Sequence, residues 1–390
     1  MIQQTDAFVI GAGPGGCAAA IALARAGFAV AIAEAKPFPR AKVCGEFISP
    51  AATAALERLI PPERLRSLGA ERVGRFHLEL NHRELSFPMR TPAWVLSRRS
   101  LDDALLAEAR DAGAEILQPA AVRAVDHHAD HATVTIDHQG ETRTRTARVV
   151  IHADGSGRFA KRRTRTAQPQ NATPKRQGVV GLKCHIKQTS TSRVTGIRMR
   201  AAHGAYIGSV AVEHANATIA LVARSRLVKQ AQQEHGPIAT SGGDALLAKL
   251  WPAFERDARQ SPWLSSGVPG SPYRPPKHPR DILVGNAAAA VEPVGGEGIG
   301  LAVRAGLTAA DLLAATPSPW SPSDLQTLQR EHARRYRRRL RFRRPACRLA
   351  AAVLERPALV NAAWPFLSAP IAGPAIVESW LRCSGKPARS

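Results

Sequence analysis

The chain has 390 residues, enough for two or three packed units, and a hydrophobic fraction of 44% that is typical of a globular protein. Its five cysteines show no Cys-x-x-Cys spacing, which favours a reducing compartment and excludes a disulfide framework or a zinc site of that kind. The net charge of +23 indicates an anionic partner, but no nucleic-acid-binding motif accompanies it, so we expect no nucleic acid partner.

The first elements follow the pattern of a dinucleotide-binding unit. An apolar strand over residues 7–10 leads into Gly11, Gly13 and Gly16, which form GxGxxG, and then into a helix over 16–26. Gly11 permits the tight turn, Gly13 lets the backbone approach a pyrophosphate, and Gly16 lets the helix pack on the sheet. The helix N-terminus then directs free N–H groups at the phosphates.

A second strand over 28–33 ends in Glu34, 23 residues after Gly11. At this position a carboxylate can accept hydrogen bonds from ribose hydroxyls. A strand before the glycines, a helix after them and an acid closing the next strand together predict a bound dinucleotide, because GxGxxG alone is a weak signal.

The next segments alternate between loop, helix and strand. A loop rich in proline and glycine over 36–50 precedes a helix over 50–60, and residues 73–96 alternate as strands of a second sheet. Residues 97–114 form an amphipathic helix, for which we expect Ser100 as the N-cap.

Residues 116–151 have a period of two and predict three antiparallel strands joined by short polar turns. Such a meander inserted in a dinucleotide-binding domain points to a flavoprotein. The segment contains His127, His128 and His131, which offer metal ligands. Because they fall on a turn, where polar residues are expected, we predict no metal site.

After a basic, polar connection over 160–177, residues 178–226 return to strands, followed by a helix over 244–259. These elements would form a substrate domain. His185 and His203 lie on its predicted strands, where each is either an acid–base group or a structural histidine.

The chain then predicts a strand from 281, a turn and a long helix up to 315, followed by a helical C-terminal region. This region holds nine arginines between Arg334 and Arg348, and the apolar stretch over 357–378 is interrupted by three prolines. No stretch is long enough to span a membrane. The arginine-rich helix is either a solvated face or a contact with a membrane surface or an acidic carrier protein.

Three separated segments resemble one enzyme superfamily: GAGPGG at 11–16, HADGSGR at 152–158 and VGNAAAAVEPVGGEGIGLAVRAG at 284–306. Their order is similar to that in the FAD-dependent oxidoreductases that include aromatic hydroxylases, flavin-dependent halogenases and geranylgeranyl reductases. The resemblance covers about residues 5–315. It implies an α/β fold in which a Rossmann-type FAD-binding domain with an inserted β-meander faces a β-sheet substrate domain, with C-terminal helices alongside.

The resemblance also implies a set of residues that contact FAD. They are Gly11, Gly13, Pro14, Gly16, Glu34, Ala35, Arg40, Cys44, Gly45, Arg98, Val122, Asp154, Gly155, Asn286, Pro293, Gly296, Glu297, Gly298 and Ile299. A guanidinium group such as that of Arg40 or Arg98 suits a phosphate or a flavin carbonyl, although a solvated surface charge is the alternative for each. Backbone N–H groups at the start of the late helix would stabilise negative charge on reduced flavin.

The segment Phe38–Pro50 is most similar to the reductase and halogenase branch, in which a cysteine at the position of Cys44 lies near the flavin. Cys44 would be a proton donor or positioning group, or else a small packing residue. Asn286 stands where the family usually has an aspartate. The aromatic motif of the reductases is missing, with residues 204–208 in the comparable region, and so is the Trp-x-Trp-x-Ile-Pro motif of halogenases, so we do not expect chlorination.

We expect non-covalent FAD, with NAD(P)H as a transient reductant. The substrate would be an apolar aromatic, polyketide or isoprenoid-like molecule. Monooxygenation by reduced flavin and oxygen is the reaction that we favour, by a small margin. The alternatives are reduction of a carbon–carbon double bond and a non-catalytic flavin-binding or lipid-binding protein.

The expected domains are FAD binding at 1–75, 94–165 and 275–315, substrate binding at 76–93 and 166–274, and a basic helical region at 316–390.

The N-terminus enters a strand without a charged leader, so we expect no signal peptide and a cytoplasmic protein. A peripheral position at the inner face of the membrane is the alternative. No feature of the sequence indicates an oligomeric state.

Overall fold

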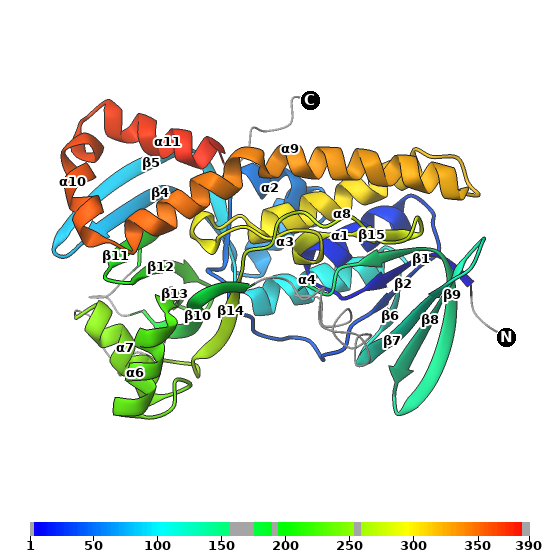
Figure 1. Ribbon diagram of the computed structural model, residues 1–390, viewed down its shortest axis with the longest axis horizontal. Coiled ribbons are helices and arrows are strands. Elements are labelled where there is room, and N and C mark those ends of the chain that lie inside the picture. The colour runs from blue at the N-terminus through cyan, green and yellow to red at the C-terminus, as the bar shows by residue number, and fades with distance from the viewer. Residues whose placement is uncertain (1–3, 156–174, 189–193, 253–258, 384–390) are drawn as a thin grey trace.

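The computed structural model describes residues 4–155, 175–188, 194–252 and 259–383 (Figure 1). Within them, a seven-stranded and an eight-stranded sheet lie side by side, and a long helix runs across both. The α/β fold class expected from the sequence is confirmed. Most of the expected connection over 160–177 lies outside the described residues.

The first sheet has the order β6-β2-β1-β9-β8-β7, and β15 pairs with the end of β9 that extends beyond β8. Its strands are β1 (Gln4–Ile10), β2 (Val30–Ala33), β6 (Glu115–Leu117), β7 (Ala120–His127), β8 (Ala132–His138), β9 (Glu141–His152) and β15 (Asp281–Leu283). The pairs of β1 with β2 and β9, of β2 with β6 and of β9 with β15 are parallel, whereas β7, β8 and β9 form the expected antiparallel meander. The carboxyl ends of β1, β9 and β15 therefore meet at one edge.

Helices cover this sheet with close backbone contacts. They are α1 (Pro14–Arg25), α2 (Pro50–Glu57), α3 (Pro62–Ser67), α4 (Arg98–Asp111) and α8 (Gly298–Ala314). A Cβ atom at Gly306 of α8 would lie 2.2 Å from the carbonyl oxygen of Gly15 in α1, so only glycine permits this crossing. The helix expected over 50–60 forms as α2 but ends earlier. The chain leaves the helix after Glu57 and starts a new one at Pro62, because proline favours the first turn of a helix.

The N-cap of α4 also differs from the expectation. Ser97, and not Ser100, has the extended backbone of a cap, and its hydroxyl oxygen accepts the N–H of Ser100 at 3.1 Å. The carboxylate of Glu213, in a turn between two strands of the second sheet, accepts the backbone N–H of Ser97 at 3.0 Å and the hydroxyl of Ser100 at 2.6 Å. The start of α4 is thus fixed to the second sheet.

The second sheet has the order β14-β10-β13-β12-β11-β4-β5-β3. Its strands are β3 (Phe47–Ile48), β4 (Glu71–Leu80), β5 (Arg83–Val95), β10 (Lys175–Lys187), β11 (Ile197–Ala202), β12 (Ala205–Val212), β13 (Asn216–Arg224) and β14 (Leu264–Pro269). The strands extend beyond the expected substrate segment 76–93, because pairing of β4 with β5 continues past a bulge after Val73. The domain boundaries stay a prediction.

Two groups of helices pack on the second sheet. On one side, α6 (Ser225–His235) and α7 (Ser241–Leu250) share an apolar cluster with β10 and β13. The helix expected over 244–259 thus starts earlier and ends at Leu250, while 253–258 lie outside the described residues. On the other side, α9 (Pro322–Leu354), α10 (Pro357–Ser368) and α11 (Ala372–Cys383) pack on β4, β5, β11 and β12 (Figure 1).

Helix α9 links the two sheets. It begins in a capping box between Ser321 and Asp324 and buries a stripe that includes His332, Tyr336 and Leu340. The Tyr336 hydroxyl donates to the carbonyl oxygen of Gly285, which follows β15, at 3.2 Å. Taken singly, none of the helices in the described ranges has the length and apolar composition needed to cross a bilayer. The bent pair Pro357–Ser368 and Gly373–Ser379 meets both requirements only when combined.

Candidate active site

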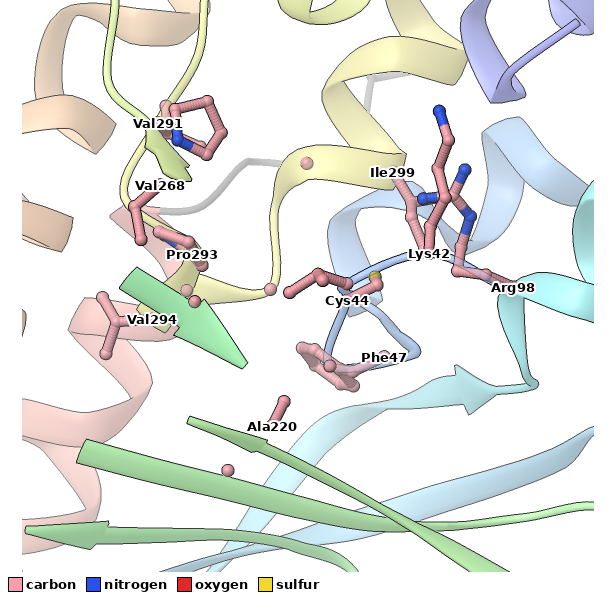
Figure 2. A pocket seen from close by; sticks show the side chains of 18 of the residues that line it. Lys42, Cys44, Phe47, Arg98, Ala220, Val268, Val291, Pro293, Val294 and Ile299 are labelled. Carbon is pink, nitrogen blue, oxygen red and sulfur yellow. The ribbon is translucent and has the colours of Figure 1, made fainter. Parts of the chain in front are cut away.

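A cavity of about 310 Å³ lies between the two sheets (Figure 2). One side is backbone from the glycine loops that follow β1, β9 and β15, and it includes Gly13, Gly155 and Gly296. The opposite side consists of apolar side chains of the second sheet. These include Phe76, Ile197, Met199, Tyr206, Val222 and Val268. The cavity therefore has a backbone face suited to a polar cofactor and an apolar face suited to a hydrophobic ligand.

The first glycine loop is held by close contacts and by Glu34. Gly11 has a φ of +98°, and a Cβ atom there would lie 2.8 Å from the carbonyl oxygen of Ala153. A Cβ atom at Gly16 would lie 2.0 Å from the carbonyl oxygen of Gly11. The buried Glu34 carboxylate accepts the backbone N–H of Ala12 at 3.0 Å and pairs with Arg40 at 3.3 Å. Glu34, at the end of β2, thus orders the glycine loop that follows β1.

The segment before β3 carries Cys44 into the cavity, opposite Pro293 and Val294 (Figure 2). The Arg98 side chain lies near the Cys44 sulfur and forms two hydrogen bonds, of 2.6 and 2.5 Å, to the buried carboxylate of Asp102. Burial alone would lower the pKa of Arg98, but the negative charge of Asp102 outweighs it and raises the pKa above its ordinary value. A permanent cation is therefore fixed beside the thiol.

Lys42 lies beside Arg98 in the same wall (Figure 2). Burial and the positive charges of Arg98 and Arg40 lower the pKa of Lys42 to about 8. The amine gains or loses its proton close to neutral pH. Sequence analysis did not single out this lysine.

Glu46 fixes the cysteine segment to the second sheet. It is fully buried and has a φ of +56°, which is uncommon for a residue with a side chain. Its carboxylate accepts hydrogen bonds from the Lys183 ammonium, the Thr218 hydroxyl, the His185 Nε2 at 2.7 Å and the Arg98 backbone N–H at 2.7 Å.

Burial alone would raise the pKa of Glu46. The hydrogen bond from His185 and the positive charge of Lys183 outweigh burial and lower this pKa to about 2. Lys183 itself is almost fully buried. One ionised carboxylate thus joins the cysteine segment, the start of α4, β10 and β13.

The late glycine loop closes the cavity. Gly296 is left-handed with a φ of +62°, and a Cβ atom there would lie 2.1 Å from the Phe47 ring. The Tyr206 hydroxyl on β12 donates to the Glu292 carboxylate at 2.8 Å, just before this loop. Glu297 is fully buried and pairs with Arg343 of α9 at 3.1 Å, so its side chain joins α9 and does not line the cavity.

The family described as FAD binding domain matches residues 4–342, which is most of the chain. The chain belongs to this family. It is therefore an FAD-dependent oxidoreductase, which favours catalysis over the non-catalytic alternative.

The proteins similar to this chain are named for different reactions. The menaquinone reductase of Mycolicibacterium smegmatis is 27% identical over 85% of this chain and 82% of its own length. A geranylgeranyl bacteriochlorophyll reductase-like protein of Thermoplasma acidophilum has a TM-score of 0.79 at 20% identity, covering 100% of this chain and 97% of its own. PqsL of Pseudomonas aeruginosa, named a probable FAD-dependent monooxygenase, has a TM-score of 0.72 at 17% identity, covering 93% and 100%. The two solved structures show likeness of fold alone.

The cavity fits FAD. A Cβ atom at Gly13, Gly45, Gly155 or Gly298 would meet nothing within 4 Å, and all four residues line the cavity. Backbone without side chains therefore faces open space on several sides, as a large planar cofactor requires. Gly298 and Ile299 open α8, where the first N–H groups of a helix lack partners within the helix.

The structure brings most of the predicted cofactor residues to this cavity. Those that line it are Gly13, Pro14, Cys44, Gly45, Arg98, Gly155, Asn286, Pro293, Gly296, Gly298 and Ile299. Gly11, Gly16 and Glu34 do not line the cavity but determine the conformation of the first glycine loop. Their contact with FAD stays a prediction.

Other predicted cofactor residues lie away from the cavity lining. Ala35 is exposed, and Arg40 stacks on the Phe38 ring at 4.7 Å beside Glu34. Val122 is buried in the meander. Burial lowers the pKa of Arg274, and the negative charge of the nearby Asp154 partly opposes this.

Two of the histidines predicted on the meander turn have carboxylate partners. His127 is hydrogen-bonded to Asp281 at 2.9 Å, and His131 to Asp130 at 2.7 Å. Among residues 4–155, 175–188, 194–252 and 259–383, no group of three or more His, Cys, Asp or Glu side chains is placed to hold a metal ion. His203 lies in the exposed turn between β11 and β12, so its expected place on a strand is wrong.

Sequence reasoning missed the partners that hold the site together. Glu46 lies within Phe38–Pro50 without a pattern that singles it out, Lys183 interrupts an apolar strand, and Arg343 is one of nine similar arginines. A charged residue inside the run VVGLKCHI was the available signal for Lys183, since a lysine on a buried strand needs a partner.

Proposed function

We propose that the protein reduces a carbon–carbon double bond in an apolar, isoprenoid-like lipid. The observation that carries this proposal is the cavity, in which the Cys44 thiol lies between the cofactor loops and an apolar sheet face. The similarity to menaquinone reductases over most of the chain supports it. This proposal reverses the order from sequence analysis, in which monooxygenation stood slightly ahead.

Bound, reduced FAD supplies the hydride equivalent that such a reduction needs. The chain supplies the rest. The apolar side chains of β11, β12 and β13 hold the hydrocarbon, and Cys44 gives a proton to the second alkene carbon. The sulfur left without its proton is stabilised by the Arg98 guanidinium and recovers a proton from solvent. Asp102 holds Arg98 in place.

The electron donor in this proposal is NAD(P)H. The sequence contains one dinucleotide fingerprint, which FAD would occupy, so the nicotinamide cofactor would dock transiently. Anaerobic mixing with NADH and with NADPH tests this step. Bleaching of the visible flavin absorption by either one supports it, whereas a flavin that stays oxidised with both requires a separate reductase.

Monooxygenation is the second candidate. Phe47, Phe76 and Tyr206 line the cavity and would stack on an aromatic substrate. The fold of PqsL is similar, although that likeness concerns the fold alone. In this reaction, oxygen would be consumed and one oxygen atom would appear in the product.

A product analysis separates the two candidates. The protein is incubated without oxygen with NADPH and menaquinone, and the extracted lipid is then exposed to air, which returns any quinol to the quinone. A product that retains two additional hydrogen atoms supports reduction of a chain double bond. An unchanged lipid, together with an oxygenated product from aromatic compounds in air, would overturn the proposal.

A further inference from the structure

Large apolar side chains are strongly exposed in one part of the described chain. Over residues 4–155, 178–188, 194–252, 259–371 and 373–379, for which side-chain burial is described, all of them lie between residues 342 and 376. They are Phe342 (64% exposed), Leu349 (67%), Leu359 (46%), Phe366 (68%), Ile371 (86%) and Ile376 (47%). We call this set the C-terminal apolar face. Such a concentration marks an interaction surface, because soluble proteins usually scatter exposed apolar side chains singly.

Basic side chains border this face on α9. Arg338, Arg341, Phe342, Arg348 and Leu349 are all exposed and follow the three- and four-residue spacing of one side of a helix. The two apolar side chains therefore lie in a row of arginines. This arrangement is typical of helices that lie in a membrane interface, where apolar groups enter the acyl region and cations contact anionic headgroups.

The helices that carry the rest of the face are anchored from beneath. Val360 of α10 and Val377 of α11 are buried in one apolar cluster with β4 and β5. Trp364 of α10 is covered by the Arg83 guanidinium at 4.6 Å, and Glu378 of α11 pairs with Arg90 at 3.4 Å. The two helices meet at a bend of 114°. Their inner sides are thus occupied, while Phe366 and Ile371 are exposed.

The anchoring cluster also reaches the cavity. Phe76, Met199 and Tyr206, which line the cavity, belong to the same apolar cluster as Val360 and Val377. Apolar packing is therefore continuous from the cavity wall to the helices of the C-terminal apolar face.

We propose that α9, α10 and α11 dock the protein on an anionic lipid bilayer through the C-terminal apolar face. Charge complementarity supports this occupant, because a net charge of +23 and the arginine row favour a negatively charged surface. Docking on a bilayer does not depend on which flavin reaction takes place.

The test is co-sedimentation with vesicles of phosphatidylcholine alone and of phosphatidylcholine with phosphatidylglycerol. The full-length protein is compared with Phe366→Ser/Ile371→Ser and with Arg338→Glu/Arg341→Glu. A matched control, Arg110→Glu/Arg226→Glu, makes the same charge change at exposed positions on α4 and α6. Flavin content and thermal melting confirm that each variant is folded.

We expect binding to the anionic vesicles that weakens with salt. The arginine variant should bind at least about tenfold more weakly. The apolar variant should also lose binding, and the control should keep most of it. Absence of binding to anionic vesicles by the wild-type protein would overturn the proposal, as would equal loss in the control. The proposal would also be overturned if the protein binds no vesicles but forms a dimer, or captures an acidic carrier protein, and the apolar variant abolishes that association. The C-terminal apolar face would then belong to that other partner. Because vesicle binding needs no turnover, its failure is distinct from failure of the proposed reaction.

Discussion

Replacing Glu46 by glutamine tests how the cysteine segment is held. The substitution preserves shape but removes the charge that Lys183 and His185 face in a buried site. The pKa of Glu46 is lowered from its usual 4.5 to about 2. At 1.36 kcal/mol per unit this corresponds to about 3 kcal/mol of folding free energy. Removing one partner from a buried ion pair typically costs about 3–5 kcal/mol, which agrees with this value.

The sign of the pH dependence follows from the lowered pKa. Folding is stabilised by the ionised carboxylate above pH 4.5, and this contribution is lost as pH falls through that value towards 2. We therefore expect the wild-type protein to exceed Glu46→Gln by about 3 kcal/mol in free energy of unfolding at neutral pH. The difference should be much smaller at about pH 3.

Urea denaturation at both pH values measures this difference. Glu331→Gln is the matched control, because the pKa of Glu331 is also lowered to about 2, by hydrogen bonds from Arg334 and Arg335, but at the solvent surface. Solvent screening should leave its variant nearly as stable as the wild-type protein. A Glu46→Gln difference below about 1 kcal/mol at neutral pH, or one that is the same at both pH values, would refute the reasoning.

Further predictions concern the cofactor loops and the thiol. Gly13→Val should fold but lose bound flavin, because its side chain would project into the open cavity, as the ratio of visible to ultraviolet absorption will show. Gly16→Val should lower the melting temperature itself, since its Cβ would lie 2.0 Å from a carbonyl oxygen. Cys44→Ser should keep its flavin and lose about 100-fold or more in product formation, and an unchanged rate would remove the thiol from the reaction. Arg343→Met should destabilise the protein by about 1–3 kcal/mol in urea denaturation, because the buried Glu297 carboxylate then keeps Arg304, at 3.4 Å, but loses Arg343.

The elements that the sequence predicted well have local signals. Gly11 and Gly16 require glycine because of contacts within a few residues or with the end of one neighbouring strand, and the period of two in the meander reports burial of one face. Boundaries were less accurate where a cap or a proline decided the end of a helix, as at Ser97 and Pro62.

The partners that hold the site together have no such local signal. Glu46 and Lys183 are 137 residues apart, and nothing in either segment indicates the other. Arg343 is chosen from the arginine-rich helix only because the stripe buried by α9 places it over Glu297. Long-range ion pairs of this kind depend on how two sheets and a long helix pack together, which cannot be predicted from a single sequence.

One measurement tests the central claim directly. The protein-bound flavin is reduced with dithionite in the absence of oxygen and mixed, in a stopped-flow instrument, with a polyprenol that has no quinone ring. The account predicts that the visible absorption of oxidised flavin returns without oxygen and that the lipid gains two hydrogen atoms. A flavin that stays reduced until oxygen is admitted, with one oxygen atom then appearing in the product, would contradict it.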